Sequence, residues 1–104
     1  MNIEILWFED CPNRYAARDL VEEVLAENRI EATIDSIEVP DLETGERVHF
    51  PGSPTIRING RDVEPDFTDT GEYTPRCRIY LTESGYAGVP EREWIEESVS
   101  TAMT

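Results

Sequence analysis

The position in this sequence best suited to chemistry is Cys11, which lies between an apolar run at residues 3–8 and a segment with helical periodicity. Pro12 follows it and suits the first position of a helix, where its missing N–H costs nothing. The N-terminus of a helix favours a thiolate through its unpaired N–H groups and its dipole. We therefore predict that Cys11 is the reactive group, with burial as an inert small hydrophobic residue as the alternative.

The charged residues around Cys11 act in opposite directions on its ionisation. Arg14 is three residues further on, and its positive charge favours a thiolate. Glu9 and Asp10 oppose a thiolate by repulsion between like charges. Asp10 reads as a loop or capping residue, and its alternative role is to deliver a proton to a leaving group.

The second cysteine, Cys77, is too far along the chain to form a CxxC motif or a metal finger with Cys11. We therefore expect no structural zinc and no bound cofactor. If Cys77 lies near Cys11, it would be a disulfide partner or a second ligand for a soft metal ion. The alternative is a strand residue that faces the core beside Ile79.

A second cluster of unusual residues lies at 49–55. Pro51 and Pro54 flank a Gly-Ser pair directly before a strand-like segment. A proline that enters a strand after a glycine bend is a candidate cis-proline, and an ordinary turn proline is the alternative. His49 reads as a surface residue, although it could act as a base if it reached Cys11.

The elements that must position these residues follow from hydrophobic periodicity and turn signals. The first strand, helix and second strand predict a βαβ unit with parallel strands, and Asn59-Gly60 predicts a two-residue hairpin. Residues 66–76 show no periodicity. Strands are predicted at residues 2–8, 32–39, 55–58, 61–64 and 77–81, and helices at residues 13–28, 41–50 and 91–102.

This order, with Cys-Pro at a helix start and Gly-Ser-Pro-Thr entering an Asn-Gly hairpin, resembles the thioredoxin fold over nearly the whole chain. More closely, Phe-Glu-Asp-Cys-Pro-Asn, Gly-Ser-Pro-Thr and a later Cys77, Arg78 and Tyr80 resemble a group of short bacterial and archaeal thioredoxin-like proteins. Some of these carry selenocysteine at the position of Cys11, and many are catalogued as alkylmercury lyase-like.

The resemblance implies one α/β domain over residues 1–104, of the form β-α-β-(α)-β-β-α, with a central mixed sheet and an extra strand at 77–81. It also implies that a cis Pro54 lies against the Cys11 thiol and that Ser53 offers backbone groups to an extended thiol substrate. One departure matters: Arg14 stands where thioredoxins have their second cysteine. A resolving thiol must then come from Cys77, another chain or a small thiol.

The composition limits the partners. The chain has 23 acidic residues and 9 basic ones, and every basic residue is Arg. The resulting net charge of −14 argues against nucleic acid and anionic membranes as partners. No apolar run reaches the length of a membrane span, and Glu4 argues against a signal peptide, so we expect a cytoplasmic protein. A lysine-free acidic surface suits a salt-rich cytoplasm, although a GC-rich genome would also replace Lys by Arg.

These observations predict a thiol-disulfide oxidoreductase-like protein. The Cys11 thiolate would attack a disulfide, a peroxide or another electrophile, on a small molecule or a protein, and Cys77 or an external thiol would resolve the product. One alternative is a mercury or organomercury site made by Cys11 and Cys77, for which Asp10 is the nearby proton donor. Another is a non-catalytic binding module, with a second copy of the chain as a partner.

Overall fold

The computed structural model, which describes residues 1–104, contains the parallel strand pair that the N-terminal sequence predicted. Strand β1 (Ile3–Trp7) pairs with β2 (Ile34–Glu38), so that Ile3 lies opposite Ile34 and Trp7 opposite Glu38. Helix α1 (Arg14–Glu27) connects them. Because β1 is apolar along most of its length, it can be central in a sheet that is covered on both faces.

A hairpin completes this sheet on the other side of β1. Strand β3 (Thr55–Ile58) runs antiparallel to β1, and β4 (Arg61–Asp62) returns along β3, which gives the strand order β2-β1-β3-β4. The turn residues Asn59 and Gly60 have φ angles of 52° and 79°, as a two-residue hairpin turn requires. The returning strand is shorter than the predicted 61–64, because Asp62 Oδ1 accepts a hydrogen bond from Glu64 N at 2.9 Å and bends the chain.

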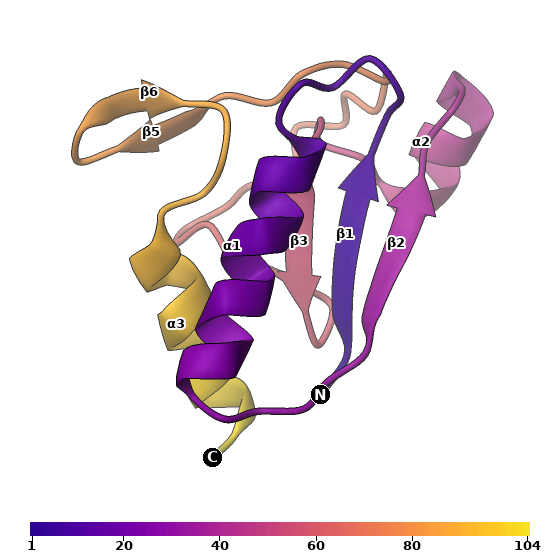
Figure 1. Ribbon diagram of the computed structural model, residues 1–104. Coiled ribbons are helices and arrows are strands. Elements are labelled where there is room, and N and C mark those ends of the chain that lie inside the picture. The colour runs from indigo at the N-terminus through magenta and orange to yellow at the C-terminus, as the bar shows by residue number, and fades with distance from the viewer.

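Apolar side chains form two separate cores, one on each face of the sheet, whose covering helices are seen in Figure 1. Helix α1 and helix α3 (Arg92–Ala102) cover one face, where side chains such as Ile5, Val21 and Ile95 pack together. Helix α2 (Leu42–Val48) lies on the opposite face, over a smaller core of Leu6, Val39 and Phe50. None of the three helices has both the length and the apolar character needed to cross a membrane.

Helix α2 confirms the short helix predicted within residues 41–50, and it runs through Gly45 without interruption. A Cβ atom on Gly45 would lie 2.1 Å from the carbonyl oxygen of Tyr73, so the close approach of the 66–76 segment explains this glycine. Asp41 caps the helix by accepting a hydrogen bond from Thr44 N at 2.8 Å. Leu42, the first residue of the helix, is 50% exposed.

The start of α1 differs from the prediction. The helix begins at Arg14 with Asn13 as its N-cap residue, so Cys11 and Pro12 lie in the preceding turn and Pro12 is not the first helical residue. The reason is local: Cys11 N donates to Phe8 O at 3.0 Å and closes a turn, and the first helical hydrogen bond runs from Ala17 N to Asn13 O.

The predicted strand at 77–81 is also wrong in position and in facing. Strand β5 (Tyr80–Thr82) pairs with β6 (Gly85–Ala87) in a two-stranded hairpin that projects from the body and lies outside the four-stranded sheet (Figure 1). Cys77 is exposed and Ile79 is 69% exposed, whereas Arg78 and Tyr80 are buried. The buried and exposed sides of residues 77–80 are exchanged relative to the prediction, because Arg78 forms an ion pair with the buried Asp62 carboxylate. Local periodicity does not reveal such a partner.

Candidate functional site

Ser53 is the residue at which the two cysteine-bearing segments meet. It is buried, and its peptide bond to Pro54 is cis, the geometry that the sequence predicted. Its Oγ accepts a hydrogen bond from Phe8 N at 3.3 Å. Its backbone N–H donates to Arg76 O and its carbonyl oxygen accepts from Arg78 N, each at 2.8 Å. Ser53 therefore binds the chain on either side of Cys77 and the start of the turn that carries Cys11.

Cys11 is a free thiol with only 5% of its surface exposed. It lies in the loop between β1 and α1, where its N–H donates to Phe8 O. Phe8 in turn donates its own N–H to Ser53. The turn fixes Cys11 in the loop that follows the carboxyl end of β1.

Cys77 is also a free thiol, but it is exposed. It forms an isolated parallel β-bridge with Ser53. On its outer side lies a groove of about 540 Å³, whose walls include Pro51 and Phe67. Of the two thiols, Cys77 is therefore the one that a molecule in solution can reach directly.

Beneath this segment, the guanidinium of Arg78 is buried against carboxylates. It donates to Asp62 at 2.6 and 3.0 Å and to Glu64 at 3.0 Å. It also donates to Thr55 Oγ1 at 2.9 Å. Burial opposes the charged form of Arg78, but the hydrogen bonds and the charge of Asp62 outweigh it and raise the pKa of the guanidinium.

Tyr80 attaches the same segment to the cis-proline. Its hydroxyl donates to the carbonyl oxygen of Pro54, and its ring lies 4.3 Å below the Arg78 guanidinium carbon. Burial raises the pKa of Tyr80 well above its ordinary value. Sequence reasoning gave Arg78 and Tyr80 only as parts of a motif; their spacing of two residues on a strand is the signal that both face the same way.

A tight backbone approach accompanies these contacts. Gly52 has a φ of +124°, and a Cβ atom there would lie 2.8 Å from the Cβ of Arg78. The Gly52 carbonyl accepts a hydrogen bond from Thr55 Oγ1 at 2.6 Å. Glycine at this position therefore permits the Arg78 segment to lie against the loop before Pro54.

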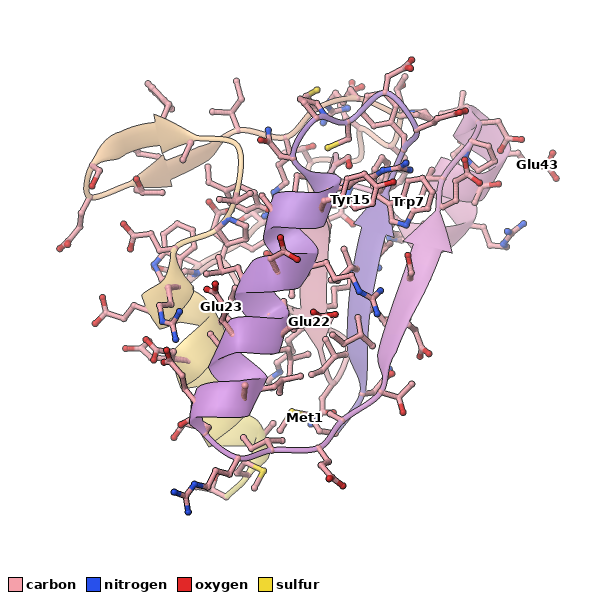
Figure 2. All side chains as sticks on the ribbon, viewed as in Figure 1. Met1, Trp7, Tyr15, Glu22, Glu23 and Glu43 are labelled. Carbon is pink, nitrogen blue, oxygen red and sulfur yellow. The ribbon has the colours of Figure 1, made fainter.

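The Arg14 side chain packs against two aromatic rings. Its guanidinium carbon lies 4.1 Å from the centre of the Trp7 ring and 4.6 Å from that of Tyr15, and it donates to the Tyr15 hydroxyl at 2.7 Å. Figure 2 shows Trp7 and Tyr15 close together where β1 ends and α1 begins. The side chain that was expected to favour a Cys11 thiolate is thus held by aromatic rings. Asp10 is exposed in the turn and its side chain has no hydrogen-bond partner.

His49 belongs to a separate cluster. Its Nδ1 lies 3.1 Å from Asp69 Oδ2, and its ring stacks on Tyr73 with 4.8 Å between the ring centres. A hydrogen bond from Gly71 N, followed by one from the Tyr73 hydroxyl, lowers the pKa of Asp69. These contacts join α2 to the 66–76 segment and do not place His49 beside Cys11. The aperiodic sequence of that segment gave no signal for them.

The arrangement can do thiol chemistry through two cysteines on neighbouring segments. No group of three or more His, Cys, Asp or Glu side chains is positioned to hold a metal ion. Comparison with protein-family models, with curated proteins and with solved structures gives no match.

Proposed function

We propose that this chain is a thioredoxin-like thiol redox protein in which Cys11 and Cys77 form the redox pair. The observation that carries the proposal is the position of Ser53, which hydrogen-bonds both to the Cys11 turn and to the residues on either side of Cys77. The parallel β1–β2 pair, the antiparallel β3–β4 hairpin and the cis bond before Pro54 support a thioredoxin-like arrangement.

The exposure of the two thiols assigns them different steps. Cys77, being exposed, attacks one sulfur of a disulfide R–S–S–R as its thiolate, forming a Cys77–S–S–R bond and releasing one thiolate, which takes up a proton. The buried Cys11 then loses its proton and attacks the Cys77 sulfur, releasing the second thiol. The substrate disulfide is reduced to two thiols, and the two protein thiols are oxidised to one disulfide.

The cycle closes when an external thiol reduces this disulfide again. In a reducing compartment such as the cytoplasm, which we propose as its location, both cysteines are free between turnovers, and they are free in the structure. No cofactor is needed, because the electrons pass between sulfur atoms.

Mass spectrometry of the protein after reaction with hydroxyethyl disulfide tests the proposal. The native chain should end as an internal disulfide without adduct. Cys11→Ser should stop as a mixed disulfide on Cys77, and Cys77→Ser should react far more slowly because the remaining thiol is buried. If the native chain forms no internal disulfide, the proposal is wrong, and the chain is better described as a binding module.

Binding of a soft metal ion is a second candidate, because both thiols are free and Ser53 hydrogen-bonds to the two segments that carry them. Mercury titrated into the native protein should then bind at one ion per chain, and either serine variant should weaken that affinity strongly. Asp10 is exposed and makes no contact that would direct a proton into the site, so we propose binding without carbon–mercury cleavage. Equal affinity in the native protein and both variants would remove this candidate.

A further inference from the structure

We infer that the redox site takes small-molecule disulfides and excludes extended polypeptide substrates, because the chain's own residues 76–78 already occupy the backbone groups of Ser53. The inference rests on the proposed function and names its substrate class. The resemblance to the thioredoxin fold implied that Ser53 offers backbone groups to an extended thiol substrate. In the structure the N–H and the carbonyl oxygen of Ser53 are both paired within the chain.

The pairing has the geometry of a short parallel strand. Ser53 donates to Arg76 O and accepts from Arg78 N, so Cys77 stands directly beside Ser53 in register. An extended peptide that docked on this edge would gain its affinity from the same two backbone hydrogen bonds. Such a peptide would therefore have to displace residues 76–78 before it could pair.

The occupying segment is held firmly at its buried side. The Arg78 side chain makes hydrogen bonds to Asp62, Glu64 and Thr55, and its relative exposure is 7%. The hydroxyl of the buried Tyr80 donates to Pro54 O. Displacing the segment would leave the Asp62 carboxylate buried without its partner, which is strongly unfavourable. The backbone N–H and carbonyl oxygen of Ser53 form what we call the slot, and residues 76–78 thus keep this slot closed in the folded protein.

A small molecule meets no such barrier. The Cys77 side chain is exposed, and the groove beside it measures about 540 Å³, within the range of roughly 300–1,000 Å³ that small-molecule sites occupy. Pro51 and Phe67 offer apolar surface there. A compact disulfide can reach the sulfur without backbone pairing and without moving residues 76–78.

Two oxidants distinguish the substrate classes: hydroxyethyl disulfide, which is neutral and compact, and insulin, whose disulfides join polypeptide chains. An insulin chain cannot form the two backbone hydrogen bonds to Ser53, so insulin should react about tenfold or more slowly than hydroxyethyl disulfide. Comparable rates would overturn the inference while leaving the redox function standing. Absence of reaction with either oxidant would overturn the proposed function and the inference together.

Opening the slot should change this preference. Arg78→Met removes the ion pairs that hold residues 76–78, so the ratio of the insulin rate to the small-disulfide rate should rise about tenfold. Arg61→Met is the matched control, because Arg61 is exposed and pairs with no carboxylate. An unchanged ratio in a folded Arg78→Met protein would contradict the inference.

Hydrogen exchange in the native protein tests the closure even if Arg78→Met does not fold. The backbone N–H groups of Ser53 and Arg78 should exchange as slowly as those of β3. Rapid exchange at both positions would show that the slot opens readily, and the inference would then be wrong.

Discussion

Arg78 Nη1 lies 2.6 Å from Asp62 Oδ2, and the two side chains are only 6% and 5% exposed. This pair joins the segment that carries Cys77 to the strand that ends the four-stranded sheet. The pKa of Arg78 is raised despite burial, because the hydrogen bonds and charge of Asp62 favour the charged form. The pair therefore persists across the physiological pH range and holds the site together.

Arg78→Met should lower the free energy of unfolding by about 3–5 kcal/mol, because it leaves the Asp62 carboxylate buried without a partner. Urea unfolding followed by circular dichroism measures the change. Arg61→Met, which removes an exposed and unpaired charge, should stay within about 0.5 kcal/mol of the native protein. If both variants lose the same stability, the buried pair is not what anchors the segment.

The buried hydroxyl of Tyr80 should make the stability of the fold depend on pH in the alkaline range. Burial raises the pKa of its hydroxyl above the ordinary 10.0, so the folded state favours the neutral form. The resulting stability is complete below pH 10 and is lost as the pH rises above it. Tyrosine absorbance titrated upward should show one group that ionises last, as the chain unfolds.

Tyr80→Phe should remove that late ionisation. It should also cost about 1 kcal/mol, since Pro54 O loses a buried hydrogen bond. Tyr86→Phe is a suitable control because Tyr86 is 80% exposed. Loss of the late phase in the Tyr86 variant instead would show that the assignment to Tyr80 is wrong.

Gly52 and Gly60 separate two kinds of glycine requirement. Both have positive φ, but a Cβ at Gly52 would lie 2.8 Å from Arg78 Cβ, whereas one at Gly60 would meet nothing within 4 Å. Gly60→Ala should therefore cost only the backbone strain, about 1–2 kcal/mol. Gly52→Ala adds overpacking and should cost about 3 kcal/mol or more. If thermal unfolding shows equal losses of stability in the two variants, the Arg78 segment moves easily to make room for the added methyl group.

The central sheet was predictable because its signals are local. Hydrophobic periodicity indicated α1 and its flanking strands, and Asn59-Gly60 marked the hairpin between β3 and β4. Their boundaries moved by at most two residues, since hydrogen bonds at element ends, such as the one that Glu64 N donates to Asp62 Oδ1, depend on side chains that periodicity ignores.

The facing of residues 77–81 could not be predicted in the same way. An arginine between Cys77 and Ile79 reads as the polar side of a strand, but here its partners Asp62 and Glu64 lie 16 and 14 residues away and only the fold brings them to it. The proximity of Cys77 to the site likewise depends on one bridge to Ser53. Long-range pairing therefore decided which cysteine is exposed.

The acidic surface predicts a response to salt. The net charge is −14, and Figure 2 shows Glu22 and Glu23 on the outward side of α1 and Glu43 on α2, so the repulsion is spread over the molecule. Surface ion pairs such as Arg18–Glu22 contribute roughly 0.3–0.5 kcal/mol each and weaken in salt, but acids outnumber arginines 23 to 9. Screening of the repulsion should therefore prevail, and the Tm at pH 7 should rise by several degrees as KCl approaches 1 M, where the Debye length is about 3 Å.

Near the isoelectric point of about 4.2 the same titration should give little change, because the net charge is then close to zero. A Tm that stays constant or falls with KCl at pH 7 would show that the acidic surface does not destabilise the fold, and with it the expectation of a salt-rich cytoplasm would lose its physical support.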